Sequence, residues 1–390
     1  MVDKSDDSLI EGIAPKKIAH IAPSLEKEFK PWHKPRKQWI RHNQWQKETD
    51  ALLSLIQLDG RPLRYLSLPG EDMLDIRILA GFCIEKGLRL KCLGYDESRT
   101  NQTEVNISVN EVSSIIEPTS TILPDNLSEL KNLKSQAFSY VDKLGPFDVI
   151  NLDLCGSISC INHPDNHQVL MNLCEYQVNR SREPWLLFLT TRADYNQVNY
   201  DHLPYYMQCL KSNAEVNSCF HDLLFEISKC NIIDYKDATN IDIILEECKD
   251  DNFVRLFATG FGKWLLKLLE NDKTWIVEML DSCWYRVEDN QLPESFPNML
   301  SLTFRFSPVH FPLIDPSKLA GSDQEIKDDE MKLAMGILEK TKRFMDLDKK
   351  IDSDETLFEM MLEKSSDLLK SARYPIEKYP KWANEKRIRF

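Results

Sequence analysis

Residues 147–154, FDVINLDL, are central to the fold because they form an almost unbroken apolar run of strand length. Such a run is typical of a strand that is buried on both faces in the middle of a parallel sheet. Similar short apolar runs recur on both sides of it along the chain. The other predicted strands are RYLSL (64–68), LRLKCLGYD (88–96), STILP (120–124) and WLLFLTT (185–191).

Stretches with helical spacing separate these strands. The predicted helices cover 72–86, 127–143 and 166–179. Strands that alternate with helices predict an α/β fold with a doubly wound, Rossmann-like parallel sheet. Sheets of this kind bind ligands beyond the carboxyl ends of their strands.

The segments on either side of this pattern are mainly helical. Two β-like segments, 274–287 and 299–306, interrupt them, and we expect these to form an antiparallel pair on one edge of the sheet. Further helices are expected at 44–57, 203–212, 216–230, 240–249 and 252–270. We therefore divide the chain into an N-terminal arm (1–60), an α/β domain (61–310) and a C-terminal helical region (311–390).

The C-terminal region carries two apolar stripes. Ser322 and Glu325 form a capping-box pattern that opens the first of its helices. Stripes of this kind either pack within the molecule or dock a protein partner, and both readings stay open here. The stripes consist of Met331, Met335, Leu338 and Met345, and of Leu357, Met361, Leu362, Leu368 and Leu369.

The composition argues against several classes of protein. The 390 residues include 49 Lys and Arg against 62 Asp and Glu, a net charge of −13, which argues against a uniformly basic surface for nucleic acid. No apolar run reaches the roughly 18 residues of a membrane span, and residues 1–12 lack the pattern of a secretory signal. We expect a cytoplasmic protein with reduced thiols. The 12 glycines form neither a P-loop nor a G-x-G-x-x-G motif.

Acidic and amide side chains gather at the predicted strand ends. Gly70 and Glu71 follow the first strand, and Gly70 permits a tight turn there. A carboxylate after the second strand is suited to accept hydrogen bonds from a ribose diol. The remaining candidates are Asp96 and Glu97 after the second strand, Asp125 after the third, and Asn151 and Asp153 on one face of the fourth.

This series resembles that of the class I S-adenosylmethionine-dependent methyltransferases over about residues 61–310. The run FDVINLDLCGS (147–157) is similar to the D-x-D-P-[FY]-G-S motif of tRNA guanine dimethyltransferases. The resemblance implies that S-adenosylmethionine is the cofactor. It also implies a methionine site at Gly70 and Glu71, ribose contacts from Asp96 or Glu97, an adenine contact from Asp125, and a catalytic pair of Asp153 and Asn151.

The same residues also permit a non-catalytic function. The first turn holds the single Gly70, and Leu154 and Cys155 replace the Pro and aromatic of the fourth motif. Acidic residues at strand ends are also common as helix caps, which is the alternative for Asp125. The alternative function is a methyltransferase-like interaction protein in a bacterial multi-protein system, such as one for antiviral defence.

Residues 29–47 combine cations with aromatic rings and contain no acid. Cations there would track phosphates while indoles stack on bases, so nucleic acid is one expected partner. The alternative is a structural clasp that packs on the α/β domain. The segment also resembles parts of uncharacterised bacterial methyltransferase-like proteins, some from defence-type gene neighbourhoods. The candidate nucleic-acid contacts are Lys30, Trp32, His33, Lys34, Arg36, Lys37, Trp39 and Arg41.

One cysteine and histidine series has spacings that zinc could use. It comprises Cys155, Cys160, His163 and His167. We expect no metal there, because Cys155 follows the central strand and HPDNH (163–167) is typical of a turn with a helix cap.

Overall fold

The fold is known from a computed structural model that describes most of the chain. The described residues are 27–97, 102–160, 165–195, 198, 202–236, 248–269, 274–287, 295–309 and 323–390. Most of the predicted helix 240–249, Ser322 of the capping box, His163 and the first 26 residues lie outside these ranges.

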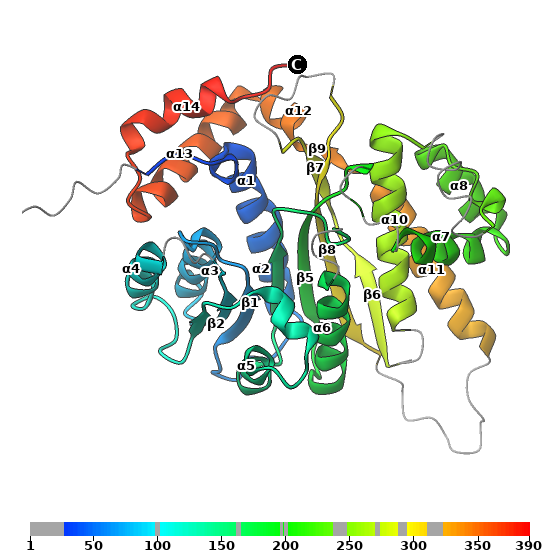
Figure 1. Ribbon diagram of the computed structural model, residues 1–390, viewed down its shortest axis with the longest axis horizontal. Coiled ribbons are helices and arrows are strands. Elements are labelled where there is room, and N and C mark those ends of the chain that lie inside the picture. Colours follow the sequence, from blue (N-terminus) through cyan, green and yellow to red (C-terminus); the bar gives the residue numbers. More distant parts are fainter. Residues whose placement is uncertain are drawn as a thin grey trace, which may run out of the picture.

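A nine-stranded sheet forms the centre of the molecule (Figure 1). Its order is β3-β2-β1-β4-β5-β8-β7-β9, and β6 pairs with β8 as well. The first five strands are parallel, while β8 runs antiparallel to β5, β6 and β7. The strands are β1 (Leu63–Ser67), β2 (Leu90–Tyr95), β3 (Thr121–Leu123), β4 (Val149–Asp153), β5 (Trp185–Arg192), β6 (Trp275–Met279), β7 (Cys283–Tyr285), β8 (Met299–Pro308) and β9 (Met345–Asp346).

Helices cover both faces of this sheet (Figure 1). The predicted α/β fold, a doubly wound, Rossmann-like sheet with an antiparallel edge, is confirmed. The helices are α1 (Pro35–Ile40), α2 (Lys47–Leu53), α3 (Leu74–Glu85), α4 (Gln102–Val112), α5 (Gln136–Leu144), α6 (Asn166–Arg180), α7 (Leu203–Ala214), α8 (Ser218–Ser228), α10 (Asp250–Leu268), α11 (Asp323–Lys342), α12 (Leu347–Asp352), α13 (Glu355–Ser371) and α14 (Tyr379–Glu385).

Two hydrophobic clusters lie on opposite faces of the sheet because successive strand residues point to opposite sides. Ile150 and Leu152 of β4 belong to the cluster under α5, α6, α7 and α10. Val149 of β4 belongs to the other cluster, which α2, α3 and α13 cover. All three side chains are at most 1% exposed, which explains the apolar run in this strand.

The N-terminal and C-terminal segments contribute to these same clusters. Trp45 and Leu369 are buried in the cluster that contains Val149. Met331 and Met335 pack against the opposite cluster, so these two methionines of the first stripe serve the core of the molecule. The domain boundaries at residues 60 and 310 stay a prediction.

Several predicted elements differ in extent from the observed ones. The helix expected at 44–57 already begins at Pro35, and a π-helical stretch at Arg41–Gln46 joins α1 to α2. The expected helix 127–143 divides into the 3-10 helix Leu127–Lys131 and α5 because Ser135 caps a new start. Helix α4 was not predicted, and Met345 lies in β9 instead of on a helix. Among the described residues, no helix is long and apolar enough to cross a membrane.

Candidate functional site

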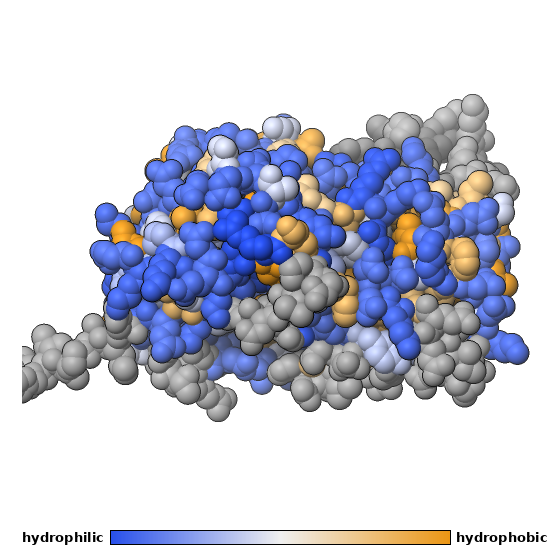
Figure 2. Space-filling model, turned by 90° about the horizontal axis from the view of Figure 1, so that it is seen from above, coloured by the Kyte–Doolittle hydropathy of each residue, from blue (hydrophilic) through white to orange (hydrophobic). Residues whose placement is uncertain are grey.

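The strand order brings the predicted site residues to one edge of the sheet. Strand β1 lies between β2 and β4, and Ser67 at its end is level with Gly94 and with Asn151. The chain leaves β1 towards β2 on one side and reaches β4 on the other, which makes this a topological switch point. The segments that follow β1, β2, β3 and β4 therefore meet here. Seen from above, this side is mostly hydrophilic, with hydrophobic patches between (Figure 2).

The turn after β1 is open at Gly70. Its φ of +60° lies in the left-handed region that favours glycine. Apart from its two chain neighbours, no described residue has an atom within 4 Å of the position that a Cβ would take. Gly70 is exposed and Glu71 is half-buried. On its other side the turn is tightly packed, because a Cβ on Gly94 of β2 would lie 3.0 Å from Pro69 Cγ. The turn thus has a fixed position and one open flank.

Acidic residues follow β2 and β3 as predicted. Asp96 is 8% exposed, and its backbone N–H donates to the carbonyl of Leu123 over 3.0 Å, which fixes it beside β3. Glu97 is exposed and accepts a hydrogen bond from the Asn126 amide. Asn126 also caps the 3-10 helix through Ser128 N–H, so the capping role expected for Asp125 belongs to its neighbour.

Asn151 lies in a buried polar network one layer below the strand ends. Its Nδ2 donates to Tyr65 Oη over 2.8 Å, and Tyr65 Oη donates to Asp75 Oδ2 over 2.7 Å. Burial raises the pKa of Asp75, although the Tyr65 hydrogen bond opposes this. Asn151 is 0% exposed, so its amide is closed off from solvent. The catalytic role of Asn151 stays a prediction.

Asp153 ends β4 and pairs with the N-terminal helix. Lys37 Nζ of α1 donates to Asp153 Oδ1 over 2.6 Å and to Thr190 Oγ1 over 3.3 Å. The side chains of Lys37 and Asp153 are 5% and 25% exposed, so the pair lies just beneath the surface. Burial lowers the pKa of Lys37, and the carboxylate of Asp153 opposes that change.

The basic aromatic segment points most of its cations inward. Lys34, Arg36, Lys37 and Arg41 are each at most 5% exposed, and His33 is also buried. Two of these cations pair with acids of the protein, Arg36 with Asp348 and Lys37 with Asp153, each over 2.6 Å. This placement agrees with the clasp alternative. Trp39 is half-buried, and the more exposed side chains of the segment include Trp32 (41%) and Lys30 (43%).

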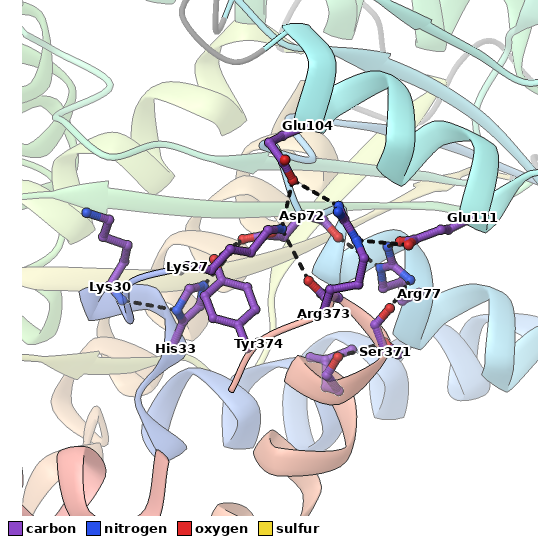
Figure 3. Close-up of polar contacts among 12 residues, drawn as sticks. Lys27, Lys30, His33, Asp72, Arg77, Glu104, Glu111, Ser371, Arg373 and Tyr374 are labelled. Atoms are coloured by element: carbon purple, nitrogen blue, oxygen red, sulfur yellow. Dashed lines mark hydrogen bonds and ion pairs between the residues drawn. The ribbon is translucent and has the colours of Figure 1, made fainter. Parts of the chain in front are cut away.

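A polar junction beside the first turn connects both ends of the described chain (Figure 3). Asp72 accepts hydrogen bonds from Lys27 Nζ and from Tyr374 Oη, both over 2.7 Å. His33 Nε2 lies 3.6 Å from Asp72 Oδ2. Burial alone would raise the pKa of Asp72, but hydrogen bonds from His33, Lys27 and Tyr374 hold it at about 2. Sequence reasoning missed this junction because its members are up to 347 positions apart.

The junction extends to α4 through alternating charges (Figure 3). Arg77 of α3 and Arg373 after α13 both pair with Glu111 of α4. Arg373 also pairs with Glu104, at the other end of α4. Three segments distant in sequence are thereby held together next to the loop after β2.

The cysteine and histidine series lies after β4, and its described members do not converge. His167 Nε2 is 3.0 Å from Ser159 Oγ and 2.6 Å from Tyr206 Oη. Burial lowers the pKa of His167 to about 3. Cys155 is exposed whereas Cys160 is buried. No group of three or more His, Cys, Asp or Glu side chains suited to a metal occurs within the described ranges.

The strand ends fit an adenosyl cofactor at the level of residue type. A buried carboxylate after β2 and a partly exposed one at the end of β4 are acceptors that such a cofactor can use, and the glycine turn after β1 is open beside them. Asp153 also keeps Oδ2 unbonded by any described residue, so this oxygen can accept a hydrogen bond.

Comparisons with known proteins complete the description. No curated protein matches the chain. Among solved structures, the chain is similar to an rRNA methylase from Streptococcus thermophilus, with 11% identity and a TM-score of 0.32 over 73% of this chain and 99% of that one. The model of one family, described as PP_RS20740-like, matches residues 26–384. Because this match spans most of its length, the chain belongs to the PP_RS20740-like family.

Proposed function

We propose that this chain binds S-adenosylmethionine at the carboxyl ends of β1 to β4 and works as a methyltransferase. The observation that carries the proposal is the order β3-β2-β1-β4, which gathers the turn at Gly70, the carboxylate of Asp96 and that of Asp153 at a topological switch point.

Each part of the cofactor has a candidate residue in this arrangement. Asp96 would accept hydrogen bonds from the ribose diol, with Glu97 beside it. The methionine part would lie against Gly70 and Glu71, where the open flank of the turn leaves room. Asp125 would approach the adenine, and Asp153 would face the methyl group. The bound cofactor supplies an electrophilic methyl group on a sulfonium.

Asp153 is suited to act on the methyl acceptor. Its Oδ1 accepts a hydrogen bond from Lys37, which leaves Oδ2 as the second acceptor of the carboxylate. Its Oδ2 is then directed to an acceptor, from which it would take a hydrogen bond or a proton. Nucleic acid as the acceptor stays a prediction, for which Lys30 and Trp32 provide exposed contacts.

A second candidate function is a methyltransferase-like interaction protein without catalysis. The observation that favours it is the ion pair of Lys37 with Asp153, since an internal cation already neutralises the proposed reaction centre. A partner would then recognise the shape of the domain. Such a protein would serve a bacterial multi-protein system, for example in antiviral defence.

Calorimetry of the full chain with S-adenosylmethionine and its demethylated product tests the proposal. We expect one site for each ligand, and Asp96→Ala should weaken both affinities at least tenfold, because a ribose without its carboxylate loses about 1.5–3 kcal/mol. Glu85→Ala is the matched control, an exposed acid at the far end of α3. Absence of binding, or equal affinity of the Asp96 variant, would contradict the proposal.

Transfer is measured separately with S-adenosylmethionine carrying a tritiated methyl group, and with bulk tRNA and rRNA as acceptors. Incorporation that depends on Asp153 supports the enzyme. Absence of both cofactor binding and incorporation favours the interaction protein, which would have lost its cofactor.

A further inference from the structure

The amine of Lys37 occupies an unusual position at the end of β4. It lies 2.6 Å from Asp153 Oδ1 and 3.3 Å from Thr190 Oγ1, and 5.0 Å from the centroid of the Trp45 ring. A carboxylate, a hydroxyl and an indole thus surround one nitrogen at the place where the proposed function puts the methyl acceptor.

A lysine amine is a nucleophile only when it is neutral. Burial lowers the pKa of Lys37, so the neutral form is more accessible here than on the surface. Asp153 is in hydrogen-bond contact with the amine and can receive its proton. The pair therefore contains both the nucleophile and the base that a transfer to nitrogen requires.

We propose that Nζ of Lys37 is itself a methylation site of this chain. The inference rests on the proposed function, because the methyl donor is the bound S-adenosylmethionine. Nζ gives its proton to the carboxylate of Asp153, and its lone pair then forms the new N–C bond. The C–S bond breaks with its electron pair on sulfur, which yields the neutral thioether product and N-methyl-lysine.

The product fits the observed surroundings of the nitrogen. A monomethylated ammonium keeps its positive charge and two N–H groups, which suffice for Asp153 and Thr190. The added methyl group increases the apolar contact of the cation with the indole of Trp45, as in aromatic cages for methylated lysines.

The transfer needs access from the side of Asp153. That side chain is 25% exposed and Cys155 beside it is exposed, so the ion pair is close to the surface at the proposed cofactor edge. Once the proton has moved to Asp153, the lone pair of Nζ must turn from that carboxyl group towards the methyl group, so transfer requires that the 2.6 Å contact opens.

Mass spectrometry of the full chain tests the inference, with S-adenosylmethionine that carries a trideuterated methyl group as the probe. The peptide with Lys37 should gain one labelled methyl group. Lys30 and Lys47 are internal controls, because their side chains are 43% and 62% exposed and would react first in any uncatalysed methylation.

Two variants sharpen the result. Lys37→Arg keeps a cation for Asp153 but removes the amine, so label at this position should be lost. Asp153→Asn should reduce labelling of Lys37 at least tenfold, since an amide cannot take the proton. The wild-type measurement decides alone if a variant fails to fold.

The outcomes separate this inference from the proposed function. Calorimetric binding of S-adenosylmethionine with no label on Lys37, or with label on Lys30 and Lys47 only, overturns the methylation site and leaves cofactor binding intact. Absence of binding overturns both. Label at Lys37 that disappears in Asp153→Asn supports both.

Discussion

Lys37 Nζ lies 2.6 Å from Asp153 Oδ1, and the two partners differ fivefold in side-chain exposure, at 5% and 25%. The N-terminal helix thus supplies the counter-charge for the acid at the end of the central strand. Because Lys37 is the more deeply buried partner, removing Asp153 and removing Lys37 should change the free energy of unfolding by different amounts.

We expect Asp153→Ala to lower the free energy of unfolding by about 3 kcal/mol, because it leaves a buried cation without its anion. Lys37→Met should cost less, about 1 kcal/mol, since water can still reach the carboxylate of Asp153 and methionine fills the space of the lysine stem. Urea unfolding of both variants measures the difference. A larger loss for Lys37→Met would contradict this account of the pair.

The junction at Asp72 predicts a pH dependence of stability in the acid range. Its folded pKa of about 2 is below the ordinary value of 3.8, so its contribution is full above pH 3.8 and is lost as the pH falls towards 2. The difference amounts to about 2 kcal/mol. Urea unfolding from pH 5 to pH 2 should therefore show a flatter dependence for Asp72→Asn than for the wild type.

Glu85→Gln is the control for that series, because Glu85 is exposed. Its pH dependence should match that of the wild type. If the free energy of unfolding depends on pH in the same way for the wild type and Asp72→Asn, the junction does not lower the pKa of Asp72.

Tyr65→Phe should lower the free energy of unfolding by about 1–3 kcal/mol, because it removes the hydroxyl between buried Asn151 and Asp75. The loss should grow as the pH rises through the folded-state pKa of Asp75 in the wild type, which lies above 3.8. The pKa of Asp75 is already raised by burial, and losing the Tyr65 donor raises it further, so the native state holds its proton over a wider range. Tyr140→Phe is the control, since the Tyr140 hydroxyl bonds no described residue; equal effects would contradict the prediction.

Gly94→Ala should destabilise the protein by about 1–3 kcal/mol, because the new Cβ would lie 2.6 Å from Ile122 Cδ1 and 3.0 Å from Pro69 Cγ. It should also weaken cofactor binding by displacing the turn at Gly70. Gly81→Ala in α3 is the matched control, with open space at its Cβ, and should stabilise the helix by up to about 1 kcal/mol. Thermal unfolding and calorimetry measure the two effects.

The sheet could be predicted because its strands carry their own signal. Val149 to Leu152 are buried on both faces, as is typical of a central strand in a parallel sheet covered by helices on both sides. The positions of Asp96 and Asp153 follow from strand ends alone. Helix α4 was missed because its polar Asn and Thr residues have low helix propensity. Its apolar signal is weak, although Val105 and Val112 lie on the same helical face and are buried.

The direction of the basic helix could not be predicted in the same way. Lys37, Arg41 and Gln44 share one helical face, and the usual expectation places such a face in water. Here the opposing surface supplies acids from distant segments, among them Asp153 and Asp75, which favour the charged face inward. The local sequence pattern identifies which residues share a face of the helix. Whether that face meets solvent or acidic residues of the protein depends on tertiary contacts.

The pairing of Tyr374 with Asp72 also constrains how the molecule is assembled during synthesis. The first strand and its turn leave the ribosome some 300 residues before their partner Tyr374 is made. Phe29 likewise packs on Tyr374 and Trp382, so this residue lacks these two ring contacts until then. A nascent chain can form its central sheet in order, but the edge proposed for the cofactor is completed last, because a chain that ends before residue 374 lacks the hydrogen bond from Tyr374 to Asp72.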